Sequence, residues 1–93
     1  MSVVLNIGEN VGALVLYTPA AMDGREIEIS RRTENARRTH AVVRRRDSGS
    51  AQVFAAVYPD LPAGDYAIWR DARTQATTAT VAGGSVSSCH WPG

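Results

Sequence analysis

VYPDLPAGDYAIW, residues 57–69, joins two apolar segments through a stiff polar connection. Its two prolines hold φ near about −65° and cannot donate a backbone hydrogen bond. Its glycine permits backbone angles that residues with side chains resist. These residue types predict a rigid structural corner between two strands, with a leucine closing the end of the core. The predicted corner consists of Pro59, Leu61, Pro62, Gly64 and Tyr66.

Short apolar or alternating runs lie on both sides of this corner, and each run ends at turn residues. No long segment has the hydrophobic period of a helix. Turn signals at intervals of about 8–12 residues are typical of a sandwich or small barrel. The sequence therefore predicts one all-β domain, residues 1–93, folded as a small antiparallel β-sandwich of seven or eight strands. The predicted strands are residues 2–7, 12–18, 25–30, 38–46, 51–58, 65–69, 76–81 and 85–91.

Alternation along these strands predicts which side chains face inward, because successive residues of a strand point to opposite faces. In the strand before the corner the choice stays open, since Phe54 could face inward in place of Val53 and Val57. In the last strand Val86 cannot face inward together with Cys89 and Trp91, so we expect a bulge or a fraying end there. The predicted core comprises Leu5, Leu14, Leu16, Ile27, Ile29, Val43, Val53, Val57, Leu61, Tyr66, Ile68 and Val81.

The composition is that of an ordinary globular protein, with 44% hydrophobic and 20% charged residues among 93. A net charge of +1 gives no global field that would attract nucleic acid or membranes. Cys89 is the one cysteine, so an intramolecular disulfide is impossible. The amino-terminal segment has no basic region of a signal peptide, and no stretch reaches the roughly 18 apolar residues of a membrane span. We therefore expect a cytoplasmic protein without a membrane span.

Seven of the ten arginines lie within residues 31–46. Read as one strand, residues 38–46 place Arg38, Arg44 and Arg46 on one face together with His40. Guanidinium groups bind phosphate and carboxylate well, so this face could bind an anionic partner. Alternatively, the arginines pair across strands with the glutamates of residues 25–30 on a solvated face. The candidate anion-binding or partner-facing residues are Arg31, Arg32, Arg38, His40, Arg44 and Arg46.

The corner segment, followed by TTATVAGGSVSSCHW (residues 77–91), resembles the closing half of prealbumin-like β-sandwiches. These include carboxypeptidase regulatory-like domains and the B-type repeats of bacterial surface adhesins, and the resemblance covers about residues 53–91. The adhesin repeats often form a Lys–Asn isopeptide bond, which this chain excludes because it has no lysine.

The whole chain also resembles a family of small bacterial proteins without an established mechanism. The likeness is carried by NIGENVGALVLYT (6–18), GREIEIS (24–30) and LPAGDY (61–66). Some members of that family carry the label phospholipase, which implies hydrolysis of a lipid ester.

Neither histidine is part of a recognisable catalytic motif. His40 and His90 are the candidate bases for Ser-His-Asp hydrolysis, but the sequence has no Gly-x-Ser-x-Gly elbow. Cys89 and His90 are adjacent, so on a strand they point to opposite faces and do not converge on a metal ion. We expect Cys89 to be a small buried hydrophobic residue and His90 to be exposed at the end of its strand. The sequence thus predicts no catalytic residue, no metal and no cofactor.

The predicted function is that of a non-enzymatic interaction or accessory module. An exposed strand edge could pair with an unknown protein partner or with a second copy of the chain. The alternative function is binding of an anion, or less favourably nucleic acid, through the arginine-rich strand face. Nucleic acid is disfavoured because proteins that bind single strands usually add aromatic platforms, which this stripe lacks. A lipid hydrolase is the third alternative.

Overall fold

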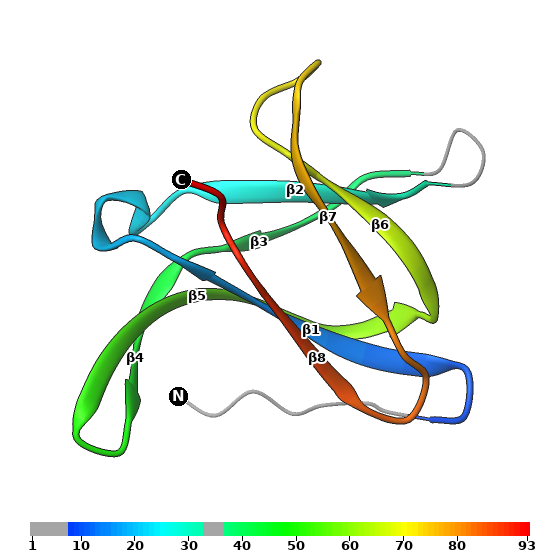
Figure 1. Ribbon diagram of the computed structural model, residues 1–93, viewed down its shortest axis with the longest axis horizontal. Coiled ribbons are helices and arrows are strands. Elements are labelled where there is room, and N and C mark those ends of the chain that lie inside the picture. The colour runs from blue at the N-terminus through cyan, green and yellow to red at the C-terminus, as the bar shows by residue number, and fades with distance from the viewer. Residues whose placement is uncertain (1–7, 33–36) are drawn as a thin grey trace.

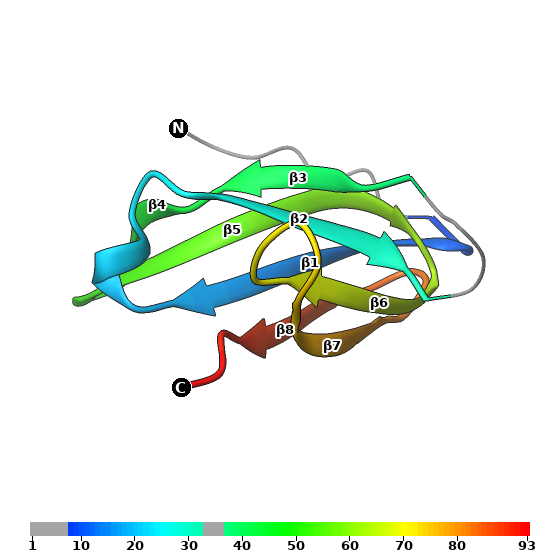
Figure 2. The ribbon, with the colours of Figure 1, turned by 90° about the horizontal axis from the view of Figure 1, so that it is seen from above.

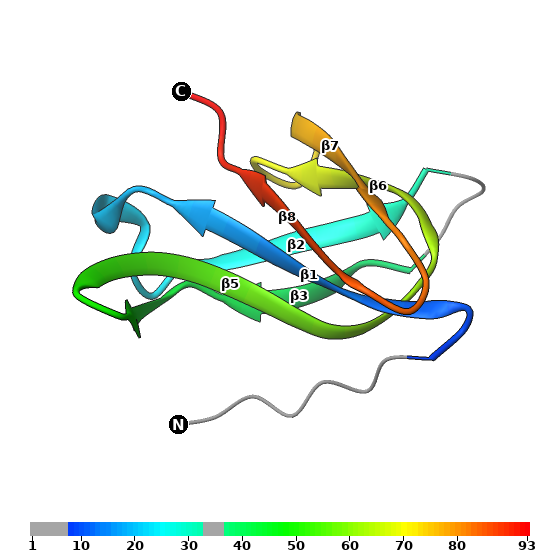
Figure 3. The ribbon, with the colours of Figure 1, turned by 60° about the horizontal axis from the view of Figure 1, so that its bottom comes forward.

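The computed structural model describes residues 8–32 and 37–93. These residues form eight strands in two four-stranded sheets, which confirms the β-sandwich predicted from the sequence (Figure 1). Sheet A has the strand order β4 (Arg44–Ser48), β5 (Ala51–Pro62), β1 (Val11–Thr18) and β8 (Val86–His90). Sheet B has the order β3 (Thr39–Val42), β2 (Glu26–Arg31), β6 (Gly64–Trp69) and β7 (Gln75–Val81). In Figure 3, strands β5, β1 and β8 of sheet A lie side by side in front of β2 and β3.

The chain alternates between the two sheets. It forms hairpins at β2–β3, β4–β5 and β6–β7, and it crosses to the other sheet after β1, β3, β5 and β7. All pairs of neighbouring strands are antiparallel except β1 and β8, which run parallel. The sandwich measures 39 × 31 × 19 Å (Figure 2). The predicted strand at residues 2–7, with its core residue Leu5, lies outside the described residues.

Helical structure in the described residues is limited to one 3-10 turn, η1 (Ala20–Met22), in the first crossing between the sheets. No helix in this part of the chain is long and apolar enough to cross a membrane.

The predicted single strand at residues 38–46 is wrong, because the chain changes sheets at Val43. The Val43 side chain is fully buried between the sheets. Its N–H donates to the carbonyl of Arg25 at 2.9 Å, and its carbonyl accepts from the N–H of Gly24 at 2.8 Å. These contacts end β3 at the edge of sheet B and begin β4 at the edge of sheet A (Figure 1). An alternating run does not reveal such a crossing, since each half alternates correctly in its own sheet.

The polar connection before Gly64 is a continuation of β5 rather than a turn. Ala13 of β1 lies opposite both Pro59 and Asp60, because the register of the two strands shifts there. Such a β-bulge accommodates proline, which cannot donate to a regular ladder. The bulge bends β5 toward the other sheet without ending it.

The corner itself is reduced to Ala63, the residue between β5 and β6. Gly64 has φ +150°, in a region that residues with side chains rarely adopt. The Tyr66 hydroxyl donates to the carbonyl of Pro62 at 2.6 Å. This contact is a tyrosine corner of the kind found in immunoglobulin-type sandwiches, where the hydroxyl binds the backbone a few residues upstream. Leu61 is buried beneath it and closes this end of the core.

The inward face of β5 follows the alternative that the sequence left open. Ala56 and Tyr58 are buried and Phe54 packs partly against the core, so Val53 and Val57 point outward. The placement of these two valines in the core was therefore wrong. The inward face brings the Tyr58 hydroxyl to the carbonyl of Ile27 at 2.7 Å, which satisfies a buried polar group. The predicted core residues that are buried are Leu14, Leu16, Ile27, Ile29, Val43, Leu61, Tyr66, Ile68 and Val81.

The last strand is regular, and the expected bulge or fraying end is absent from it. β8 keeps an unbroken register with β1 over residues 86–90. Cys89 packs partly against the core, whereas Val86 faces outward with 49% of its surface exposed. Val86 and Cys89 therefore do not both face inward, because Val86 is exposed to solvent.

Candidate interaction surface

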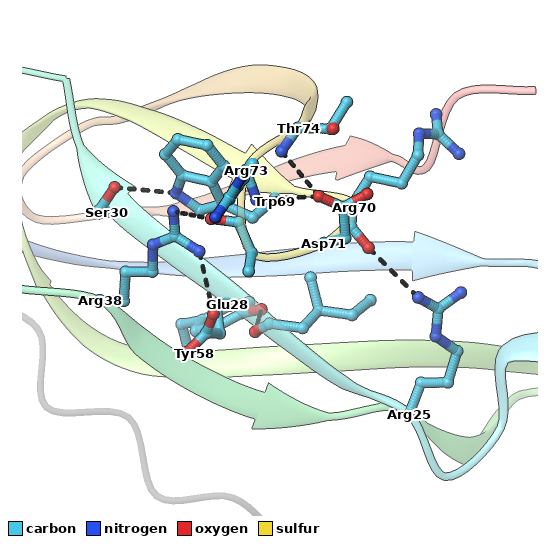
Figure 4. Close-up of polar contacts among 12 residues, drawn as sticks. Arg25, Glu28, Ser30, Arg38, Tyr58, Trp69, Arg70, Asp71, Arg73 and Thr74 are labelled. Carbon is cyan, nitrogen blue, oxygen red and sulfur yellow. Dashed lines mark hydrogen bonds and ion pairs between the residues drawn. The ribbon is translucent and has the colours of Figure 1, made fainter.

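The outer face of sheet B is polar, and its principal arginine is bound by this chain's own groups. Arg38 donates to Glu28 at 3.1 Å and to the carbonyl of Ala72 at 2.8 Å (Figure 4). Its guanidinium carbon lies 3.8 Å from the centroid of the Trp69 ring, and the indole N–H donates to the Ser30 hydroxyl at 3.0 Å. This geometry combines an ion pair with a cation–π contact. Trp69 is the partner that the sequence analysis missed, and its position at the outward end of a strand was the available signal.

The other candidates on this sheet also contact their own chain. Arg31 donates to the carbonyl of Ala63 at 3.3 Å and thereby contacts the corner. The His40 imidazole lies 4.0 Å from the Glu26 carboxylate, and both side chains are exposed. Arg32 is exposed, and its backbone N–H donates to the carbonyl of Asp65 at 2.9 Å. On sheet B the structure therefore shows the cross-strand pairing that was one of the two interpretations of the arginine stripe.

The candidates in residues 38–46 do not share a face, because β3 and β4 belong to different sheets. Arg38 and His40 lie on the outer face of sheet B, whereas Arg44 and Arg46 lie on sheet A. Arg44 is exposed, and Arg46 donates through Nε to the carbonyl of Ala55 at 3.3 Å. Neither forms an ion pair with any residue that the structure describes.

The outer face of sheet A contains an apolar groove of about 860 Å³. Val15 and Val57 are directly opposite on β1 and β5, and both are partly exposed. Polar side chains from the β4–β5 hairpin and from β8 complete the lining. The apolar lining residues are Val15, Tyr17, Ala20, Val53, Phe54, Ala55 and Val57, and the polar ones are Thr18, Arg46, Asp47, Gln52 and His90.

A row of neighbouring residues crosses all four strands of sheet A at the groove. The registers place Arg44, Ala55, Tyr17 and His90 side by side on β4, β5, β1 and β8. The Tyr17 and His90 rings stack with their centroids 5.2 Å apart. Ala55 is the smallest member of the row and is fully buried, and Arg46 donates to its carbonyl. The groove therefore has an aromatic wall on one side and arginines on the other.

The sequence contains a signal for this surface in the two central strands of sheet A. β1 and β5, the two central strands of sheet A, have apolar side chains on both faces. A sheet with one solvated face normally alternates between apolar and polar residues. Continuous apolar runs in both central strands therefore indicate that the outer face of sheet A is also partly apolar.

The two histidines are on opposite sides of the sandwich. His40 lies on β3 and His90 on β8, each exposed at the outer face of its own sheet. Cys89 and His90 point to opposite faces of β8, as predicted, and Cys89 contacts the core. Burial raises the pKa of the Cys89 thiol, which keeps it protonated at neutral pH.

No protein-family model, curated protein or solved structure matches this chain. The relationship to prealbumin-like sandwiches therefore stays a prediction, although the two-sheet architecture itself is present. The same holds for the relationship to the small bacterial proteins that carry the label phospholipase.

Proposed function

We propose that this chain is a non-enzymatic interaction module that binds a protein partner on the outer face of sheet A. The apolar groove over β1 and β5 is the observation that carries the proposal. Val15, Val53 and Val57 are partly exposed there. Covering apolar surface stabilises a complex by roughly 25 cal/mol per Å² before the costs of association are subtracted. A partner that covers the groove would gain this free energy.

The polar groups around the groove favour a particular partner chemistry. Arg46 and Arg44 lie on one side, and Gln52 and His90 offer further hydrogen-bonding groups. Protein interfaces typically combine an apolar centre with a polar rim of this kind. The partner segment that fits best presents apolar side chains to the valines and a carboxylate to the arginines.

A matched pair of substitutions tests the proposal. The wild-type protein is used to purify partners from its native cell, and the binding of an identified partner is then measured by calorimetry. Val57→Arg places a charge in the groove, and we expect at least a tenfold loss of affinity. Thr78→Arg places the same charge on the exposed outer face of sheet B, and we expect unchanged affinity. Equal affinity of both variants for the partner would refute the assignment to sheet A.

The arginines of β4 support a second candidate function, the binding of anions. Arg44, Arg45 and Arg46 are consecutive, and none forms an ion pair with another described residue. A single-stranded oligonucleotide and inorganic phosphate are suitable probes. Binding through several phosphates weakens steeply as salt increases, whereas binding in the groove should respond little. Loss of oligonucleotide binding in Arg45→Gln, which alters an arginine that does not line the groove, with the groove partner still bound, would favour this function.

A further inference from the structure

We infer that β8 pairs antiparallel with β8 of a second copy of this chain, which joins two copies of sheet A into one eight-stranded sheet. The inference goes beyond the groove, because it concerns the free edge of the same sheet. Among the described residues, β8 pairs with β1 alone, and no described backbone group pairs with its other side. Such an edge is a template for another strand.

Charge distinguishes the four edges of the sandwich. The described strands at the edges are β3 and β7 in sheet B, and β4 and β8 in sheet A. β4 contains three consecutive arginines, which would repel each other if two β4 strands paired. β3 contains no acid or arginine but lies directly after Arg38. β7 and β8 have no acidic residue, lysine or arginine, so charge opposes pairing least on that side of the molecule.

The exposed side chains single out β8 rather than β7. Val86 is the one large hydrophobic residue among those described that is classed as exposed, and it lies on β8. It faces outward beside Ala13, on the same face as the groove. The exposed positions of β7, in contrast, are Gln75, Thr78 and Thr80, which water solvates well. Pairing at β8 would therefore cover apolar surface as well as backbone.

The hydrogen bonds to β1 determine which peptide groups of β8 are free. The carbonyl of Ser85 accepts from Ala13 at 3.1 Å, and the N–H of Trp91 donates to Tyr17 at 2.8 Å. In a parallel pair, the residues that bind the neighbour alternate along the strand. The odd-numbered residues thus turn their peptide groups toward β1, and Val86, Ser88 and His90 turn theirs toward the free edge.

One register uses all of these groups. A two-fold axis at Ser88 pairs Ser88 with Ser88 of the second copy, and it pairs Val86 with His90 of the second copy. All five residues of β8 are then paired, and the row of Tyr17 and His90 continues across the junction into Val86 and Ala13 of the second copy. A register shifted by two residues would leave one end of each strand unpaired.

The size of this contact predicts a weak association. Two paired strands of five residues bury less than the roughly 1,200 Å² of a standard stable interface. We therefore expect a weak, reversible equilibrium between monomer and dimer, which should be sought at protein concentrations of about 10–500 µM.

Sedimentation equilibrium of the full chain over this concentration range tests the inference. Wild type should show a monomer–dimer equilibrium. Ser88→Arg places two arginines directly opposite each other, and we expect it to stay monomeric. The control Thr78→Arg, on the edge strand of the other sheet, should dimerise as wild type does. A monomeric wild type at every concentration, a Ser88→Arg variant that still dimerises, or dissociation by Thr78→Arg would each overturn the inference.

A cross-link tests the register. In a Cys89→Ser background, Ser88→Cys should form an intermolecular disulfide on oxidation, because directly opposite residues have Cα atoms about 5.5 Å apart. Ser87→Cys in the same background should cross-link much more slowly, since residue 87 lies opposite residue 89 of the second copy. Faster cross-linking at position 87 would overturn the register. None of these variants alters Val57, so failure of the dimer leaves partner binding in the groove to be judged by its own experiment.

Discussion

Gly64 combines an unusual backbone angle with a close neighbour. Its φ is +150°, and a Cβ at this position would lie 3.2 Å from Nη2 of Arg31. Backbone strain of this kind costs roughly 1–3 kcal/mol, so Gly64→Val should lower the free energy of unfolding by that amount. The matched control is Gly8→Ala, because nothing lies within 4 Å of a Cβ built at Gly8. Urea unfolding of both variants measures the difference, and equal midpoints would contradict the strain at this corner.

Ionisation of Tyr58 should lower the free energy of unfolding at alkaline pH. Burial raises the pKa of its phenol, and the neighbouring Cys89 thiolate raises it further. The unfolded chain has a phenol pKa of about 10. The contribution of the neutral phenol is therefore complete below that pH and is lost as the pH rises toward the higher folded value.

Substitution of Tyr58 tests this linkage. Tyr58→Phe removes the hydrogen bond to Ile27 and should lower the free energy of unfolding by about 1 kcal/mol at pH 7. Above pH 10 the variant should lose stability less steeply than wild type. Urea unfolding at pH 7 to 11 measures both profiles. Parallel profiles would show that Tyr58 does not contribute to the pH dependence.

At the scale of a strand, β5 presents apolar side chains to two different environments. Ala56 is fully buried between the sheets, whereas Val57 is partly exposed in the groove. Ala56→Arg would bury an unpaired charge and should destabilise the fold by more than about 3 kcal/mol. Val57→Arg should change the free energy of unfolding by less than about 1 kcal/mol. Chemical unfolding of the two variants compares adjacent positions, and the reverse order would contradict the assignment of the faces.

The strands were predictable because alternation and turn residues are local properties. Ile27 and Ile29, for example, were placed in the core by the glutamates that alternate with them. The change of sheet at Val43 was not predictable, since an alternating run looks the same in one sheet or two. The inward face of β5 was ambiguous because Phe54 and Val57 offer apolar surface on both sides. The outward apolar residues that caused this ambiguity, Val53 and Val57, are among those that line the groove.

The arginine stripe shows how tertiary structure divides a local pattern. The sequence correctly suggested cross-strand partners for its first part, and Arg38 binds Glu28. The stacking of Arg38 on Trp69 joins residues 31 positions apart, which no local pattern reveals. Arg44 and Arg46 fall on the other sheet because of the crossing at Val43. Arg38 therefore does not share a continuous face with Arg44 and Arg46, and the candidate interaction surface is the outer face of sheet A.

At the scale of the whole molecule, the two outer faces of the sandwich differ in chemistry. Sheet B is covered by polar groups that contact one another, such as Glu28 with Arg38 and Asp65 with Thr80. Sheet A combines an apolar groove, arginines on β4 and an uncharged edge at β8. This asymmetry is the basis for assigning both interactions to one sheet.

Amide hydrogen exchange along β8 in dilute solution tests most directly whether this sheet ends in an available edge. The parallel pairing with β1 predicts slow exchange for the amides of Ser87, Cys89 and Trp91. It predicts fast exchange for the amides of Val86, Ser88 and His90, whose N–H groups point away from β1. Uniform protection of all six amides, or fast exchange at the odd-numbered positions, would contradict the account.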